Sequence, residues 1–267
     1  MTTTTDTLSH PCDTPPCREP LDGSRLRTLV AKVFTARRIE ALRPRVRALA
    51  GAVLDEMIAG GAPADLVENF ALPFPVVVGC ELLGVPEGDR PLLRVWSDVV
   101  LSTSALTAEE FQAGIGELRA YLATLITQRR TAPADDLLTA LIEARDGHDR
   151  LSEPELASVA LAVLAGGHET TATRIAGFVH ALLARPDRFA ELRADPARVP
   201  AVVEELLRRF AFGQGVGYCA GAELARVELQ EAFGALVTKM PRLRPAGEVV
   251  WKTRPLVRSP ETLPVAW

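Results

Sequence analysis

Hydrophobic residues recur three to four positions apart over most of the chain, which is the spacing that buries one face of an α-helix. Between residue 24 and about residue 60 this spacing predicts two helices. Thr35 is placed to cap the second of them, and Gly60 is placed to end it. Pro44 removes a backbone donor inside that helix and is expected to bend it. An amphipathic segment over residues 65–83 predicts a further helical stretch.

The longest predicted helix is expected to cross the core. Ser152 and Glu155 form a capping-box signature, and the helical spacing continues to Arg185, before Pro186. At ~1.5 Å per residue such a helix spans about 45 to 50 Å, the width of a whole domain. Its middle is apolar on most sides, as expected of a helix surrounded by others. Shorter helices are predicted at residues 107–130, where Thr107 and Glu110 form another capping box, and at residues 135–144, 200–210 and 219–239.

Strand signals are confined to the last part of the chain. Short runs of β-forming residues between prolines lie at residues 249–251, 255–258 and 263–267. Together with the helices, they predict a mainly α-helical fold with a long central helix and few strands. Residues 1–22 are rich in Thr, Pro and Asp and predict a disordered polar tail, which leaves residues 23–267 as one domain.

Composition narrows the classes of function. The 267 residues are 48% hydrophobic and 24% charged, and the formal charge of −4 attracts neither nucleic acid nor an anionic membrane in general. The most apolar stretch, residues 70–84, contains two prolines and Glu81 and does not predict a membrane span. The first residues show no export signal, and the four cysteines fit no disulfide framework. We therefore expect a cytoplasmic protein.

One cysteine follows a glycine-rich turn and precedes a predicted helix. Cys219 ends the run FGQGVGYC, which starts at residue 212. Glycines permit a tight turn and a close approach of the backbone to a flat ligand, and the free amides at a helix N-terminus favour a thiolate. A thiolate can ligate a metal ion. The alternative is a buried structural cysteine beside an ordinary helix-starting turn.

This segment resembles the ligand loop of the cytochrome P450 family, which reads Phe-Gly-x-Gly-x-x-x-Cys-x-Gly. Every fixed position of that pattern is present, at Phe212, Gly213, Gly215, Cys219 and Gly221. The resemblance implies that heme b is the cofactor, that Cys219 ligates its iron, and that the other four residues surround it. A thiolate ligand donates electron density to the iron and favours cleavage of the O–O bond.

A second motif, GGHETT, occupies residues 166–171 inside the long predicted helix. Gly166 and Gly167 weaken the helical ladder, and a threonine can bond a carbonyl one turn back, so the segment can open a notch beside a ligand. The motif resembles the family's oxygen-binding groove. That resemblance places both glycines beside the cofactor and implies that Glu169 and Thr170 deliver protons to dioxygen. The alternative is a flexible spot at which two glycines let another helix pack closely.

Three further residues match the family. Arg27 matches an arginine that contacts a heme propionate, with a solvated surface arginine as the alternative. Glu205 and Arg208 match a Glu-x-x-Arg pair that braces the scaffold around the ligand loop. Without that context, such a pair adds only ~0.2 to 0.5 kcal/mol on an exposed helix. The resemblance extends from about Ser24 to Trp267, with interruptions.

The interruptions concern two blocks of the family. Members carry a helix, strands and a loop ahead of the position of Ser24, and further strands and a meander between the positions of Arg209 and Phe210. Neither block has a counterpart in this sequence. We therefore expect a reduced fold, weakened heme binding, and C-terminal strands that lack sheet partners.

The leading interpretation is a heme-thiolate monooxygenase that oxidises a small hydrophobic substrate, as in secondary metabolism, with electrons from a ferredoxin-type donor. One alternative is a heme enzyme that uses peroxide directly or rearranges its substrate. Another is a non-catalytic heme-binding or helical remnant of a full-length member.

Overall fold

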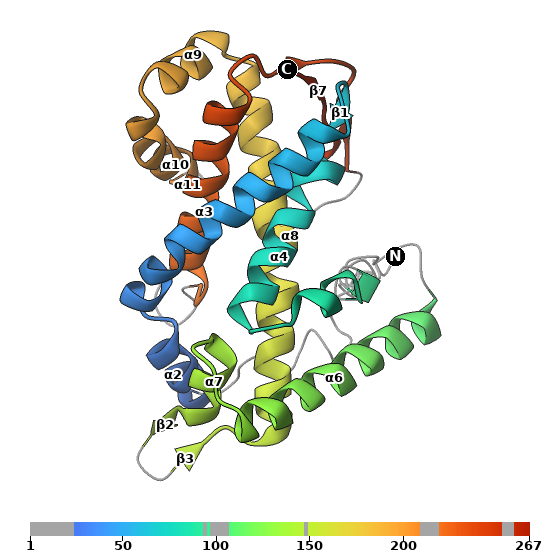
Figure 1. Cartoon of the computed structure of the whole chain (residues 1–267), viewed down its shortest axis with the longest axis vertical. Coiled ribbons are helices and arrows are strands. Elements are labelled where there is room, and N and C mark those ends of the chain that lie inside the picture. Colours follow the sequence, from blue (N-terminus) through green and yellow to red (C-terminus); the bar gives the residue numbers. More distant parts are fainter. Residues whose placement is uncertain (1–23, 93–94, 97–106, 147–148, 209–218, 253–258) are drawn as a thin grey trace, which may run out of the picture.

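A computed structural model describes residues 24–92, 95–96, 107–146, 149–208, 219–252 and 259–267. The long helix α8 (Glu153–Leu183) runs through the middle of the molecule, and other helices cross it on several sides (Figure 1). Helix α8 packs mainly against α4 (Pro73–Leu82) and α6 (Ala108–Thr131), whereas α11 (Ala222–Lys239) packs mainly against α3 (Ala36–Ala59). The predicted mainly helical fold with a central long helix is confirmed.

The first described part forms the two predicted helices, α2 (Ser24–Val33) and α3. The hydroxyl of Thr35 accepts a hydrogen bond from the amide of Arg38 at 3.3 Å and caps α3 as predicted. Gly60 is the C-cap, and Pro44 lies inside the helix. Local capping chemistry therefore fixes both ends of α3.

The segment predicted as one helical stretch over residues 65–83 is divided. It consists of β1 (Ala64–Asp65), the π-helical turn η1 (Val67–Ala71) and α4. The amide of Leu72 donates to the carbonyl of Val67 at 2.9 Å, a bond one residue wider than that of an α-helix. Pro73 has no amide hydrogen, so the π-helical ladder stops and α4 starts afresh. The short 3₁₀ turn η2 (Glu87–Asp89) follows.

Both predicted capping boxes are present. Thr107 and Glu110 cap α6, and Ser152 and Glu155 cap α8. Helix α7 (Leu137–Glu143) is capped by Asp136. Helix α8 ends at Leu183, two residues earlier than predicted, because α9 (Pro186–Ala194), which the pattern did not predict, starts with a proline in its first turn. The 3₁₀ turn η3 (Pro196–Arg198), α10 (Val199–Leu207) and α11 complete the helices.

Within the described residues, the strands form three small antiparallel sheets. Strand β7 (Pro264–Ala266) pairs with both β1 and β4 (Arg244–Pro245), and β5 (Val250–Trp251) pairs with β6 (Pro260–Thr262). Strands β2 (Arg145–Asp146) and β3 (Asp149–Arg150) form the third sheet. The expectation that the C-terminal strands lack partners is therefore wrong, since three strands of two or three residues that the pattern did not predict, β1, β4 and β6, provide them. The predicted strand at residues 255–258 and the predicted tail at residues 1–22 lie outside the described residues.

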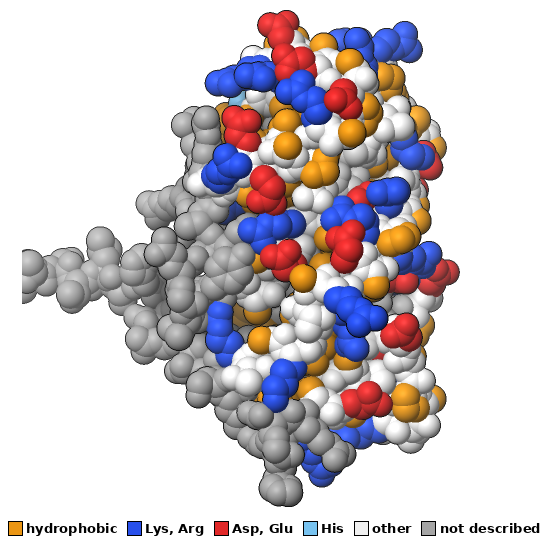
Figure 2. All heavy atoms as spheres, turned by 90° about the vertical axis from the view of Figure 1, so that its left-hand side faces the viewer, with side chains coloured by type: hydrophobic (Ala, Val, Ile, Leu, Met, Phe, Trp, Pro, Cys, Tyr) orange, Lys and Arg blue, Asp and Glu red, His pale blue; other side chains and the backbone are white. Residues whose placement is uncertain are grey.

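Charges of both signs alternate over the face shown in Figure 2, as expected for a chain with a small net charge. Several are paired; for example, Glu81 accepts hydrogen bonds from Arg45 and Arg90, both at 2.7 Å. Within the described ranges, every helix is too short or too polar to traverse a lipid bilayer.

Candidate active site

Helices α8 and α11 run in the same direction where they touch. The hydroxyl of Thr171 on α8 donates to the carboxyl of Glu228 on α11 at 3.1 Å. Further along both helices, the ring centroids of Phe178 and Phe233 are 6.2 Å apart. Because the second contact lies C-terminal to the first on each helix, the N-terminal parts of the two helices lie on the same side of this contact.

The two sequence motifs lie on that side. Gly166 is five residues before Thr171, and Cys219 is nine residues before Glu228. Helix α11 begins six residues before Glu228, which is about 9 Å at ~1.5 Å per residue. The thiol and the glycine pair therefore come from neighbouring helices at the same end of their contact.

Cys219 lies three residues before Ala222, where α11 begins, whereas the pattern predicted a helix from residue 219. Its side chain is exposed, and its carbonyl accepts a hydrogen bond from the amide of Ala222 at 3.2 Å. Gly221 is the N-cap residue, and a Cβ atom added there would lie 4.0 Å from the sulfur of Cys219. Because the thiol is accessible, the alternative of a buried structural cysteine is excluded. The other residues predicted around the heme in this loop, Phe212, Gly213 and Gly215, lie outside the described residues.

Cys80, the other described cysteine, is buried, whereas Cys219 is exposed. Cys80 on α4 is fully buried, and this burial raises the pKa of its thiol to about 12. Such a thiol stays protonated at neutral pH, whereas ligation of a metal requires the thiolate. Of these two residues, only Cys219 is placed to act as a ligand.

The glycine motif borders open space. A Cβ atom added at Gly166 or Gly167 would meet no atom within 4 Å, so the described part of the chain packs no other helix against either glycine. The alternative that these glycines admit a close helix contact is therefore not supported. The hydroxyl of Thr170 donates to the carbonyl of Gly166 at 2.7 Å, which is the predicted bond one turn back, and α8 continues as a helix through the motif.

The acidic residue of the motif has a partner that the sequence did not predict. Glu169 is exposed, and its carboxylate lies 3.5 Å from the ammonium of Lys252. Lys252 follows β5, and the pairing of β5 with β6 holds this part of the chain near α8. An exposed pair at this distance adds little stability. It places a second proton-carrying group beside Glu169, however.

His168 points away from solvent. Its side chain is 3% exposed, and neither ring nitrogen has a hydrogen-bond partner among the described residues. This burial lowers the pKa of the imidazole to about 4. The buried imidazole is therefore neutral at physiological pH.

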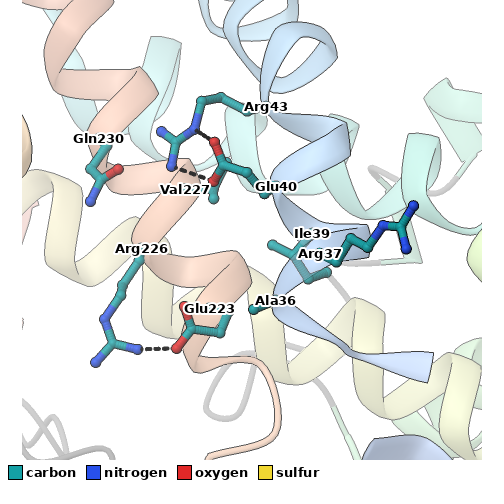
Figure 3. A pocket seen from close by; sticks show the side chains of 9 residues that line it. All are labelled: Ala36, Arg37, Ile39, Glu40, Arg43, Glu223, Arg226, Val227 and Gln230. Carbon is teal, nitrogen blue, oxygen red and sulfur yellow. Dashed lines mark hydrogen bonds and ion pairs between the residues drawn. The ribbon is translucent and has the colours of Figure 1, made fainter. Parts of the chain in front are cut away.

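One described pocket is distinct from these residues. It has a volume of about 380 Å³ and lies between the start of α3 and the first turns of α11 (Figure 3). Its walls are largely ionic, with Arg43 bonded to Glu40 and Arg226 bonded to Glu223. Neither Cys219 nor any residue of α8 lines it. This pocket is therefore not the place predicted for the cofactor.

The remaining predicted site residues are Arg27, Glu205 and Arg208. Arg27 is half-buried on α2, which packs against α7, and its contact with a propionate stays a prediction. Glu205 and Arg208 are both exposed, and the described ion pairs do not join them. Instead, Glu204 of α10 accepts a hydrogen bond from Arg226 of α11 at 3.0 Å. Among the described residues, α10 and α11 are thus joined through Glu204, the residue next to the predicted Glu205.

The described residues fit a heme group. An exposed thiol stands at a helix N-terminus, and the open space beside Gly166 and Gly167 lies on the neighbouring helix at the same end of the contact. A thiolate is a soft ligand suited to iron, and residues without a Cβ allow a flat ring to approach the backbone. Cys219 would hold the iron, and the two glycines would face the ring.

Comparison with known proteins shows which family the chain matches. Residues 94–205 match the family model for cytochrome P450. Mycinamicin IV hydroxylase/epoxidase from Micromonospora griseorubida is 40% identical over 93% of this chain and 78% of the relative. Nocardicin C N-oxygenase from Nocardia uniformis subsp. tsuyamanensis is 39% identical over the same shares. The solved structure of the mixed-function P450 MycG has a TM-score of 0.88 and 38% identity, covering 94% of this chain and 80% of that chain.

The relatives also contain segments that this chain lacks. The alignment with the Micromonospora hydroxylase spans 311 positions, more than the 267 residues of this chain, so some of these segments are internal. This supports the expectation of a shortened family member. The identity, the coverage and the matching fold together show that the chain belongs to the cytochrome P450 family and is an oxidoreductase of the monooxygenase type.

Proposed function

We propose that this chain binds heme b through Cys219 and inserts oxygen into a small hydrophobic secondary metabolite. The observation that carries the proposal is the exposed Cys219 thiol at the start of α11, at the same end of the helix contact as the open space beside Gly166 and Gly167. The described residues thus offer a ligand for iron and room for a flat ring.

Two residues of α8, Glu169 and Thr170, are the protein groups proposed to take part in the reaction. When heme is bound through Cys219, it supplies the activation of dioxygen, which a thiolate ligand favours. Thr170 directs its only hydroxyl hydrogen to the carbonyl of Gly166, so its oxygen can accept a hydrogen bond from a donor in the site. Glu169 is exposed to water, and its carboxylate lies 3.5 Å from the ammonium of Lys252. We infer that Glu169 and Thr170 deliver the protons that monooxygenation consumes.

The names of the relatives support the proposed substrate class. Their names include a hydroxylase/epoxidase for mycinamicin IV, an N-oxygenase for nocardicin C and a hydroxylase for 6-deoxyerythronolide B. A solved relative is a hydroxylase of the leinamycin biosynthetic pathway in Streptomyces atroolivaceus, at a TM-score of 0.86 and 37% identity. We infer a substrate of this broad class, and electrons from a ferredoxin-type donor.

Heme binding is the first test. Purified protein titrated with hemin should reach one heme per chain, and the reduced carbon monoxide complex should have the strongly red-shifted Soret band of a thiolate-ligated heme. Loss of family segments predicts weaker binding than in full-length relatives, since each charge-assisted hydrogen bond contributes about 1.5 to 3 kcal/mol. A protein that takes up no heme would refute the proposal and favour a non-catalytic remnant.

Replacing Thr170 by alanine should uncouple the reaction while leaving heme bound. We expect product per reductant consumed to fall by roughly tenfold, because a positioned proton donor contributes ~10²- to 10⁴-fold and Glu169 remains. Reductant oxidation, product and peroxide are measured together.

The matched control for this substitution is Thr238→Ala. Thr238 is also exposed, and its hydroxyl donates to the carbonyl of Gly234, one turn back, at the same distance of 2.7 Å. It lies near the C-terminal end of α11, away from the proposed site. The Thr238→Ala variant should retain wild-type coupling. Equal coupling in Thr170→Ala and Thr238→Ala would contradict the role of Thr170.

A further inference from the structure

One face of helix α9 is apolar and ends in an arginine. Pro186, Phe189, Ala190 and Arg193 have the i, i+3, i+4 and i+7 spacing of a single helix face. Helix α9 contacts both α8 and α11 and lies at the end of the molecule shown at the top of Figure 1. Phe189 is buried in the core, whereas Ala190 and Arg193 are exposed. This face therefore borders both the interior and the solvent.

The same face of α9 forms one wall of a pocket of about 220 Å³. Residues 241–245, which follow α11, form another wall, and Leu183, the last residue of α8, also lines the pocket. Leu183 and Leu243 are 8% and 5% exposed, so they present apolar surface while belonging to the core. The three prolines of the lining, at positions 186, 241 and 245, have no amide hydrogen to offer a ligand. The walls are therefore largely apolar.

Backbone and side-chain bonds hold these walls in place. The guanidinium of Arg193 donates to the carbonyl of Pro241 at 3.1 Å, which joins α9 to the segment that follows α11. The amide of Leu243 donates to the carbonyl of Met240 at 3.0 Å, and β4, which starts at Arg244, pairs with β7. The pocket is thus formed by the fold itself. A pre-formed pocket needs little ordering when a ligand binds.

The polar residues of the lining are three arginines, Arg193, Arg242 and Arg244. Among the described residues that line the pocket, none is an aspartate or a glutamate, and Asp187 and Glu191, the acids of α9, are not part of it. The described ion pairs join none of the three arginines to a carboxylate, that of the C-terminal residue included. The pocket therefore carries positive charge that the described residues around it do not compensate.

The pocket of Figure 3 provides an internal comparison. It is lined by arginines as well, but Glu40 and Glu223 belong to the same lining and bond to Arg43 and Arg226. Its charges are compensated from within. A cleft with apolar walls and charges of one sign instead concentrates its field on an incoming ion of the opposite sign. The pocket behind α9 is therefore suited to an anion that comes from outside the chain.

The size and the walls narrow the class of anion. A water molecule takes up about 30 Å³ in the liquid, so the pocket has room for roughly seven groups of that size. This is less than the ~300 to 1,000 Å³ of sites for drug-sized ligands. Apolar walls suit a short hydrocarbon body, and the planar fork of an arginine suits a carboxylate. Both features together describe a small amphipathic acid.

We propose that this pocket is a second ligand site, which binds a small carboxylic acid with a short apolar body. The body contacts Leu183, Phe189 and Leu243, and the carboxylate is bound by Arg242 and Arg244. The site goes beyond the proposed function and shares no residue with it. Leu183 lies 16 residues after Gly167, about 24 Å along α8 at ~1.5 Å per residue.

The first experiment measures the ligand class with octanoate, which has a carboxylate and seven further carbons. Isothermal titration calorimetry of the full chain with heme bound should show saturable binding of octanoate. Acetate lacks the apolar body, and octan-1-ol lacks the charge, so each should bind at least tenfold more weakly. Absence of octanoate binding, or equally tight binding of octan-1-ol, would overturn the proposal.

The second experiment locates the bound octanoate with variants of exposed residues, which should leave the fold intact. The double variant Arg242→Gln/Arg244→Gln should weaken binding by roughly 10- to 100-fold for each charge-assisted hydrogen bond that is lost. Ala190→Trp should abolish binding, because the indole fills the pocket and leaves the arginines in place. Arg119→Gln is the matched control, since Arg119 is an exposed arginine of α6 outside the pocket, and it should bind octanoate like the wild type.

The outcomes also separate this proposal from the proposed function. Wild-type affinity for octanoate in the double variant or in Ala190→Trp would overturn this inference, because the acid would then bind elsewhere, for example near the heme. A chain that takes up no heme but binds octanoate through this pocket would overturn the proposed function and support the second site.

Discussion

Replacing Cys219 by alanine should abolish the red-shifted Soret band of the reduced carbon monoxide complex and reduce monooxygenation to background. The reason is that the thiolate provides both the bond to iron and the electron density that favours O–O cleavage. The exposed sulfur at the start of α11 is not packed into the core, so its removal should leave the unfolding free energy almost unchanged. The measurement combines a hemin titration with reduced carbon monoxide spectra and urea unfolding.

The chain contains its own control for this substitution. Cys80→Ala removes a fully buried thiol that stays protonated, so it should lower the stability but keep the spectrum of a thiolate-ligated heme. The two variants should therefore show opposite patterns. Retention of the red-shifted band in Cys219→Ala would refute the ligand assignment, whatever the stability of the variant.

Replacing Phe233 by alanine should lower the free energy of unfolding by about 3 to 5 kcal/mol, the usual cost of removing a buried aromatic ring. Phe233 is 2% exposed and contacts Phe178 across the α8–α11 contact. This contact also sets how the N-terminal parts of the two helices are placed relative to each other. We therefore expect the folded fraction of the variant to bind heme more weakly than the wild type, as measured by hemin titration under conditions where both are folded.

Leu122→Ala is the control for general destabilisation. Leu122 is fully buried on α6, which packs against α7 and α8, and its removal should cost about 2 to 5 kcal/mol. Heme affinity of its folded fraction should stay near that of the wild type. A loss below about 1 kcal/mol in Phe233→Ala would contradict the described packing, because only a poorly packed ring is removed so easily.

Local signals predicted the helices well. Thr35, the Thr107 and Ser152 capping boxes and the C-cap at Gly60 each act within four residues, so a single stretch of sequence contains both partners. The boundary errors also have local causes. At Pro73 a proline divides the stretch predicted as one helix over residues 65–83, which the periodicity alone does not do. Before Pro186 the predicted end of α8 was two residues too late, and α9, which starts at that proline, was not predicted.

Contacts between distant residues were not predictable in this way. Glu228 binds Thr171 from 57 positions away, and nothing in its own surroundings distinguishes it from the arginine-bound Glu231. Lys252 reaches Glu169 because β5 pairs with β6. The thiol and the threonine of the site were identified from motifs, whereas the contacts of Glu228 and Lys252 depend on how the chain packs.

The ion pair between Arg47 on α3 and Glu231 on α11 joins residues 184 positions apart. During synthesis at ~5 to 20 residues per second, the apolar side of α3 therefore waits roughly 10 to 40 seconds for its main packing partner to be made. Nascent chains of this length expose an uncovered helix face to the crowded interior of the cell. Extra chaperones should shield that face until α11 has emerged from the ribosome. In a heterologous host we therefore expect them to raise the yield of folded protein more than slower translation at low temperature does.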